Sequence, residues 1–181
     1  FLKKLNVENF EQLGNLKFID NKVETKDISN KKILKNLAKY KIWVAASTHK
    51  GEELLAAKTH ILLKKKQKNL ITIIIPRHLD NINRIVDEIK KLNLNVTTYN
   101  SNKKNFENTD IYIVDTFGLS RDFYSIASTV FLGKSIFHKG GQNPLEAARF
   151  NCNILHGPNI DNFKDIYKYL HELKIAKKVS S

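Results

Sequence analysis

The sequence has one cysteine, no methionine and no long apolar run. A single cysteine, Cys152, excludes an intramolecular disulfide and any cysteine-rich zinc cluster, which is typical of a reducing compartment. Cys152 lies beside an expected strand in FNCNIL, so we expect a small buried residue rather than a nucleophile. No apolar run approaches the roughly 18 residues of a membrane span, and the N-terminus lacks the layout of a signal peptide. We therefore expect the chain as given to be soluble.

Several catalytic and cofactor motifs are also missing. No G-x-G-x-x-G follows the first expected strand, which argues against a dinucleotide-binding Rossmann domain. The P-loop motif G-x-x-x-x-G-K-[ST] is also absent, which argues against a P-loop nucleotide-binding protein. The six histidines show no HExxH and no spacing of metal ligands, and we expect His60 and His171 to be exposed on helices. Ser47 and His49 are too close in sequence for a hydrolase dyad, and G-x-S-x-G is absent. We therefore expect no cofactor and no metal.

The chain has few arginines despite a formal net charge of +13. Only four of its 31 basic residues are arginine, and base-edge recognition of nucleic acid favours arginine. Many lysines fall on expected helices, where a solvated polar face is the simplest interpretation. An anionic membrane surface or substrate is the next interpretation, and a basic nucleic-acid-binding module remains an alternative.

From Lys41 onward, short apolar runs alternate with longer amphipathic segments. This pattern predicts parallel strands joined by right-handed helical crossovers, an α/β doubly wound parallel sheet that is Rossmann-like. In the helix expected at 51–66, the buried face is predicted from the apolar positions Leu54, Leu55, Ile61 and Leu62 and the stem of Lys58. The expected strands are 42–46, 70–75, 95–99, 110–115, 129–133 and 153–157, and the helices between them are 51–66, 79–93, 119–127, 144–151 and 161–173.

Residues 1–40 differ from the rest. They form a basic lead with a helix expected near 28–39, which we expect to pack on the sheet domain formed by residues 41–181. The missing initiating methionine is consistent with a piece of a longer protein. No internal repeat or low-complexity tract occurs.

Unusual polar residues follow the expected strands rather than precede them. In an open parallel sheet, ligands bind outside the carboxyl ends of the strands, where helix N-termini converge. Residues of this kind on one rim predict a phosphate-and-sugar pocket. They occur in segments 47–53, 76–78, 115–118, 133–135, 138–146 and 158–159.

The segment HKGGQNPLEAARF, residues 138–150, is the richest of these. Gly140 and Gly141 permit a tight turn and a close approach of a ligand to the main chain. Asn143 can cap a helix, Pro144 suits its first position, and Glu146 falls at the third, as in a capping box. A carboxylate beside two glycines also suits the hydroxyls of a ribose. The residues leave both interpretations open.

The motifs WVAASTHKGEE, IIIPRH, VDTFG, VFLGKS, KGGQNPLE and HGPNIDNFKD closely resemble, in order and spacing, the C-terminal half of the Kdo transferases. These are inverting GT-B glycosyltransferases that move 3-deoxy-D-manno-octulosonic acid (Kdo) from CMP-Kdo onto a lipid A precursor. The likeness runs from about Leu13 to about Ile166. It implies the C-terminal, donor-binding half of such an enzyme, with the catalytic base on an N-terminal domain that is not in this sequence.

The resemblance also implies roles for individual residues. Lys17 would stabilise the transition state, Glu146 would hold the ribose hydroxyls, and amides near Ser47 and Gly140 would face the phosphate. Leu119 stands where the family usually has an acid, so only its backbone would make contact, and Gln142 stands where histidine is common. The donor-binding residues implied are Ser47, Thr48, Pro76, Arg77, His78, Phe117, Gly118, Leu119, Gly140, Gly141, Asn143, Pro144, Leu145 and Glu146.

The implied partners are CMP-Kdo, an anionic membrane surface and, through the missing domain, a lipid A precursor. The full protein would act at the cytoplasmic side of a bacterial inner membrane, and this chain alone would be inactive. Another GT-B enzyme with a UDP or GDP donor is the alternative within the same fold.

Overall fold

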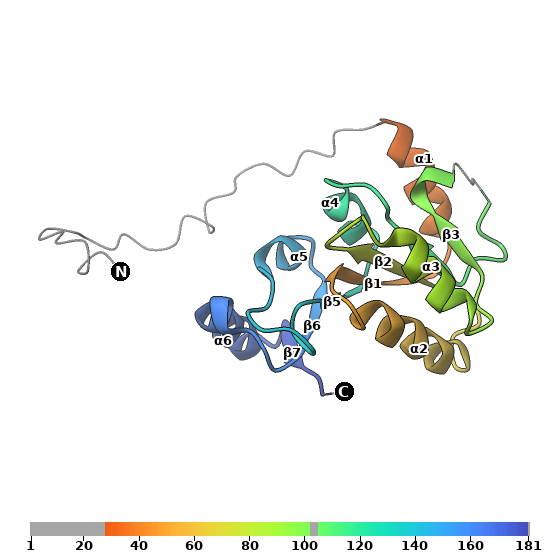
Figure 1. The fold of residues 1–181 in the computed structure, drawn as a ribbon. Helices are drawn as coiled ribbons and strands as arrows, with labels where there is room; N and C mark the ends of the chain where they lie inside the picture. Colours follow the sequence, from red (N-terminus) through yellow and green to blue (C-terminus); the bar gives the residue numbers. More distant parts are fainter. Residues whose placement is uncertain (1–27, 102–104, 181) are drawn as a thin grey trace, which may run out of the picture.

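The computed structural model describes residues 28–101 and 105–180, which form a sheet with helices on both faces (Figure 1). All pairs of neighbouring strands are parallel, in the order β3-β4-β2-β1-β5-β6-β7. This confirms the expected doubly wound α/β fold. The strands are β1 (Lys41–Thr48), β2 (Leu70–Pro76), β3 (Val96–Thr98), β4 (Ile111–Ile113), β5 (Thr129–Leu132), β6 (Asn153–His156) and β7 (Ala176–Lys178).

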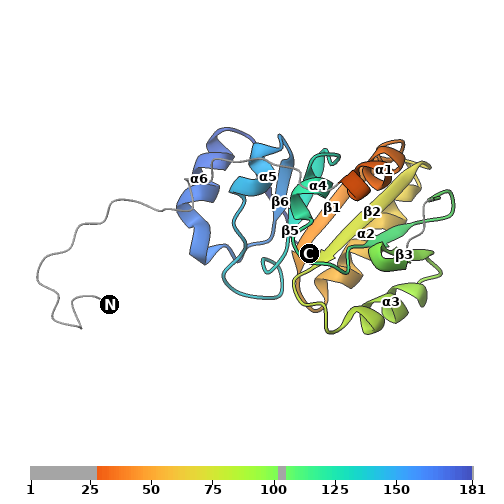
Figure 2. The same cartoon turned by 90° about the horizontal axis from the view of Figure 1, so that it is seen from above.

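The helices form two layers. One hydrophobic cluster joins the sheet to α1, α4, α5 and α6, and a second joins the other face to α2 and α3. Figure 2 shows α1 and α3 on opposite sides of the sheet. None of the helices in the described part of the chain is long and apolar enough to cross a membrane. The helices are α1 (Ile28–Leu37), α2 (Glu52–Lys64), α3 (Ile82–Lys90), α4 (Ser120–Tyr124), α5 (Leu145–Arg149) and α6 (Lys164–Glu172), with short 3₁₀ turns η3 (Tyr99–Ser101) and η4 (Asp161–Phe163).

The core follows from the apolar runs. Every residue of β2, sequence LITIIIP, is buried, as a central parallel strand covered on both faces requires. On α3, Ile85 and Ile89 are buried and face the sheet. Leu37 of α1 is fully buried in the first cluster, so the helix expected near 28–39 packs on the sheet as predicted. The domain boundary at residue 40 stays a prediction.

The buried face of α2 differs from the predicted one. Ala56, Ala57 and His60 are buried, whereas Leu62 is 64% exposed. Small alanine side chains let the helix backbone lie close to the sheet, whereas Leu54 and Leu55 are only half-buried and Leu62 is turned outward. The prediction failed because it followed the largest apolar residues and ignored the alanines.

His60 is buried, so the prediction that it is exposed was wrong. Its Nδ1 lies 2.9 Å from Thr72 Oγ1 and its Nε2 lies 3.5 Å from Asp110 Oδ1. Burial lowers the pKa of His60 below its ordinary value. The contact with Thr72 and the nearby Asp110 carboxylate help to accommodate the imidazole, although Nε2 itself makes no hydrogen bond among the described residues. His171 is exposed, as expected.

Cys152 is buried, as expected, with its Sγ 3.4 Å from the carbonyl oxygens of Tyr124 and Ala127. Burial raises the pKa of its thiol to about 11, which keeps it protonated and unreactive.

Strand β7 was not predicted. Only Ala176 of its three residues is buried, so it has no apolar run to reveal it.

Candidate functional site

The site lies where the strand order reverses. From β1 the chain builds one half of the sheet through β2, β3 and β4, and then returns to place β5 on the other side of β1. The carboxyl ends of β1 and β5 therefore flank the switch point of the sheet. Crevices at such points are where open α/β sheets bind their ligands.

A cleft of about 280 Å³ opens at this edge of the sheet. Its volume is close to the lower end of the roughly 300–1,000 Å³ range of ligand pockets. Five of the residues implied by the resemblance line it together, namely Ser47, Arg77, Asn143, Leu145 and Glu146. Its other lining residues are Ser120, Tyr124, Leu132, Gln142 and Arg149.

Ser47 lies at the cleft in an unusual backbone conformation. Its φ is +52°, and the β1–β2 register shifts between Ala46 and Thr48. Positive φ is uncommon for a residue other than glycine and occurs often at functional sites. Gly133 makes this approach possible, because a Cβ there would lie 2.4 Å from the Ser47 carbonyl oxygen. The end of β1 and the loop after β5 are therefore pressed together beside the cleft.

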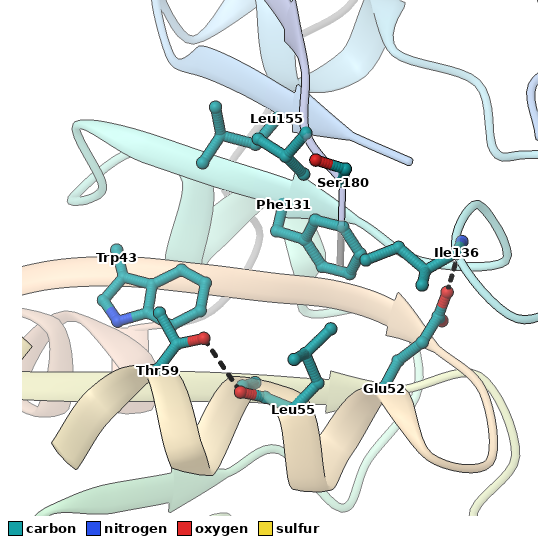
Figure 3. Close-up of a pocket in the computed structure, with 10 residues that line it drawn as sticks. Trp43, Glu52, Leu55, Thr59, Phe131, Ile136, Leu155 and Ser180 are labelled. Atoms are coloured by element: carbon teal, nitrogen blue, oxygen red, sulfur yellow. Dashed lines mark hydrogen bonds between the residues drawn. The ribbon is translucent and has the colours of Figure 1, made fainter. Parts of the chain in front are cut away.

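Glu52 holds these two loops in place, and the sequence interpretation missed it. Its carboxylate is fully buried and accepts four backbone N–H bonds, from His49 at 3.0 Å, Lys134 at 2.8 Å, Ser135 at 3.1 Å and Ile136 at 3.2 Å. Figure 3 shows Glu52 reaching from α2 to the Ile136 amide. The available signal was the acidic pair that directly follows Gly51, because acids at a helix start are suited to nearby N–H groups.

The segment before α5 realises only half of the expected capping box. The Leu145 N–H at the start of α5 donates to Asn143 Oδ1 at 3.1 Å, while Pro144 stands at the N-cap position and makes no side-chain bond. Glu146 does not complete the box. Its Oε1 accepts a 2.7 Å hydrogen bond from Nε of Arg121 in α4, and its carboxylate lines the cleft. The acid is therefore oriented by a cation rather than used for capping.

The two glycines of this segment have positive φ values, +108° for Gly140 and +70° for Gly141. A Cβ on Gly140 would lie 2.8 Å from Asn162 Nδ2, and one on Gly141 would lie 3.0 Å from the Asn159 carbonyl oxygen. They provide the expected tight turn. The space that their missing side chains leave is taken by the chain before and within η4, not by the cleft.

Arginine is concentrated at the cleft. Arg77 and Arg149 line it and Arg121 pairs with Glu146, which accounts for three of the four arginines in the sequence. The Arg77 side chain makes no ion pair among residues 28–101 and 105–180. Burial, and then the charge of Glu146, raise the pKa of the Tyr124 hydroxyl, which stays protonated and able to donate. A guanidinium fork near a carboxylate suits a ligand with both phosphate and hydroxyl groups.

The remaining implied residues lie outside the lining of the cleft, and Lys17 lies outside the described residues. Phe117 is 67% exposed, and Gly118 and Leu119 lead from it into α4, whose Ser120 reaches the cleft. His78 is exposed next to Arg77. Buried side chains at or beneath the rim are those of Thr48, Pro76 and Pro144, with Gly140 and Gly141 also buried.

A second cavity, of about 240 Å³, lies against α2 and shares no lining residue with the cleft (Figure 3). It is lined mainly by apolar side chains, including Trp43, Leu55, Phe131 and Leu155. The carboxylate of Glu52 is directed at backbone N–H groups, so this cavity has no charged group to offer a phosphate. No metal-binding group of three or more His, Cys, Asp or Glu residues occurs in the described part of the chain.

The sheet topology and the cleft define a Rossmann-like domain with its candidate ligand site at the switch point. No protein-family model matches the chain. It is 35% identical over 178 residues to a 3-deoxy-D-manno-octulosonic acid transferase of Rickettsia bellii, a match that covers 98% of this chain and 42% of that protein. It is also 34% identical over 140 residues to the transferase of the same name from Haemophilus influenzae, covering 77% of this chain and 33% of the relative.

One solved structure extends this likeness to the fold. The C-terminal CMP-Kdo binding domain of WaaA from Acinetobacter baumannii superposes with a TM-score of 0.73 at 22% identity, covering 81% of each chain. The predicted resemblance to the Kdo transferases is confirmed. The chain spans less than half of the length of these two transferases.

Proposed function

We propose that this chain is the donor-binding domain of a Kdo transferase and that it binds CMP-Kdo in the cleft at the switch point. The observation that carries the proposal is the meeting of Arg77, which follows β2, with Glu146 and Arg149 of α5 in one cleft. The similarity in fold to the CMP-Kdo binding domain of WaaA supports the choice of CMP over other nucleotides.

Each group has a role that follows from its chemistry. The Glu146 carboxylate, oriented by Arg121, accepts hydrogen bonds from the ribose hydroxyls. Arg77, which makes no ion pair within the described part of the chain, supplies positive charge to the phosphate. The exposed turn at Phe117 and Gly118 offers backbone groups to the base. Ser47 closes the cleft on the side of β1.

In the proposed reaction, a hydroxyl of a lipid A precursor attacks the anomeric carbon of Kdo and CMP leaves. The base that takes the hydroxyl proton belongs to the other domain of the enzyme, and Lys17 stabilises the transition state. Negative charge grows on the CMP phosphate as the bond breaks. A positioned donor aimed at such charge is worth on the order of 2 to 4 kcal/mol of barrier.

The proposal also includes the place in the cell where the complete enzyme acts. Lipid A precursors and cytoplasmic membrane leaflets are anionic, and a chain with a net charge of +13 is attracted to both. The complete enzyme then works at the cytoplasmic side of the inner membrane, and this domain alone binds donor without transferring it.

Calorimetric titration with CMP, UDP and GDP tests the proposal. We expect CMP to bind with one site per chain and UDP and GDP to bind more weakly. Binding of UDP or GDP in preference to CMP would indicate another GT-B donor. An absence of heat with all three, for a chain whose circular dichroism shows a folded α/β protein, would reject a nucleotide-binding role. A gel shift with nucleic acid that CMP does not compete would favour the alternative class.

A further inference from the structure

Three histidines from three different loops meet beside the cleft. His49 follows β1, His78 follows β2 and His138 follows β5. The ring centroids of His49 and His78 are 5.4 Å apart, and those of His49 and His138 are 5.3 Å apart. His49 and His78 come two residues and one residue after the cleft residues Ser47 and Arg77, so the cluster continues the cleft along the rim. We call these three residues the histidine cluster.

Backbone carbonyls fix one nitrogen on two of the rings. Nδ1 of His49 lies 3.1 Å from the Ser47 carbonyl oxygen, and Nε2 of His138 lies 3.2 Å from that of Lys50. A carbonyl oxygen only accepts, so each of these nitrogens carries a hydrogen. The opposite nitrogens, Nε2 of His49 and Nδ1 of His138, make no hydrogen bond within residues 28–101 and 105–180, and neither does the His78 ring. Protonation would turn these free nitrogens into donors.

Among the residues that the structure describes, the one acid that acts on His49 is already engaged by other groups. The charged and titratable groups that act on His49 are Glu52 of α2, His78 and His138. Glu52 is buried and its two oxygens are already bound to four backbone N–H groups. Burial lowers the pKa of His49, the charge of Glu52 opposes this, and the two neighbouring imidazoles lower the pKa further. Protonation of the cluster is therefore favoured most when an external anion arrives.

Two ordinary explanations of such a cluster do not fit. The three rings are not core residues, because His49 and His138 are half-buried and His78 is exposed. They are not arranged as metal ligands, since no metal-binding group of this kind occurs in the described part of the chain. Imidazoles at an open rim next to an arginine-lined cleft suit an oxyanion.

We propose that His49, His78 and His138 bind an oxyanion of the donor, either the carboxylate of its sugar acid or its phosphate. This inference rests on the proposed function of the cleft. Binding takes up a proton on the cluster, so affinity for the anion rises as the pH falls through the ordinary range of histidine. Ligands without an oxyanion show no such dependence.

Calorimetry with cytidine, CMP and free Kdo at pH 6 and pH 8 tests the inference on the complete chain. Kdo is titrated both alone and with saturating CMP. The test variant is the double substitution His78→Asn with His138→Asn, which leaves the His49 turn intact, and the control is His171→Asn, an exposed imidazole on α6. We expect the double variant to lose about tenfold or more in affinity for one anionic ligand at pH 6, since hydrogen bonds to charged groups are the strong ones. Cytidine binding should not change.

A loss for CMP identifies the phosphate, and a loss for Kdo alone identifies the carboxylate. Equal affinities of wild type and double variant for all ligands, or the same loss for cytidine, would overturn the inference. If the double variant shows no such specific loss but CMP still binds, the histidine inference is wrong and the proposed function is unaffected. If wild type binds free Kdo in a histidine-dependent manner but not CMP, the proposed nucleotide site is wrong and the anion site is right.

Imidazole NMR signals give a second readout that does not depend on affinity. Addition of the anionic ligand should raise the apparent pKa of His49, with the buried His60 as an internal reference. Unchanged titration of His49 in the presence of bound ligand would contradict proton-linked anion binding.

Discussion

At the scale of single residues, Glu146 has the most specific role in the proposed site. It is the acid that the sequence interpretation could assign either to a helix cap or to a ligand. The structure places its Oε1 2.7 Å from Nε of Arg121, with the carboxylate 39% exposed at the cleft. A carboxylate fixed by one cation still has acceptor positions for two adjacent hydroxyls.

Glu146→Ala should weaken CMP binding by about 1 to 3 kcal/mol, because it removes the acceptor for the ribose hydroxyls. Calorimetry measures the change, and urea unfolding checks the fold. Glu172→Ala, an acid in the last turn of α6, is the matched control and should bind CMP like wild type. Loss of stability without loss of affinity would assign Glu146 to the helix alone.

Glu52 should matter for stability more than its neighbour Glu53. Its Oε1 accepts from Ser135 and Ile136, and its Oε2 accepts from His49 and Lys134, so a glutamine would turn an NH₂ group toward two N–H donors. We expect Glu52→Gln to cost about 2 to 5 kcal/mol of unfolding free energy. Burial raises the pKa of Glu53, which favours its neutral form, so Glu53→Gln should cost under about 1 kcal/mol. Equal costs in urea unfolding would contradict this role of Glu52.

At the scale of elements, the sequence predicted the strands and helices that have strong periodicity. The apolar stripe of α3 and the buried run of β2 were correct because burial there is set by large side chains. The α2 face was wrong because Ala56 and Ala57 pack against the sheet. β7 was missed because two of its three residues are exposed lysines, and its strand form depends on pairing with β6.

The α2 interface can be tested by two substitutions of opposite sense. Ala57→Leu inserts atoms into a fully buried position and should cost about 1 to 3 kcal/mol. Leu62→Ala removes a side chain that is 64% exposed and should change stability by no more than about 0.5 kcal/mol. Thermal and urea unfolding of both variants measure the difference. A larger loss of stability for Leu62→Ala than for Ala57→Leu would indicate that the leucines, and not the alanines, pack on the sheet.

The site was predictable only in part, because its geometry depends on contacts between segments that are distant in the sequence. Ser47, Arg77, Asn143, Leu145 and Glu146 follow strands, and strand ends of a parallel sheet share one edge. Which of the polar residues at that edge point into one cleft depends on turn geometry that a local pattern does not contain. The Arg121–Glu146 pair and the histidine cluster join residues 25 to 89 positions apart, as His49 and His138 illustrate, so no short motif reveals them.

At the scale of the whole molecule, histidine burial makes stability depend on pH. The pKa values of His49, His60 and His156 are lowered mainly by burial, so the folded chain binds fewer protons than the unfolded chain near pH 6. Stability is then present above the ordinary histidine pKa of 6.5 and is lost as the pH falls through it.

We expect the unfolding free energy in urea to fall between pH 7.5 and pH 5.5. Glu53 acts in the opposite sense, because its raised pKa favours the folded state as the pH falls. Measuring the slope in the Glu53→Gln background removes that opposing contribution. A stability that is flat or rises on acidification in this background would show that the buried imidazoles do not control it.

The account as a whole depends on one ligand occupying the rim at the switch point. NMR mapping of backbone amides during a CMP titration tests this most directly, with the single tryptophan, Trp43, reporting on the apolar cavity against α2. The account predicts saturable shifts at Ser47, Arg77 and Ser120 and through segment 140–146, with the Trp43 indole unchanged. Shifts confined to the α2 cavity, or none at all in a folded chain, would contradict it.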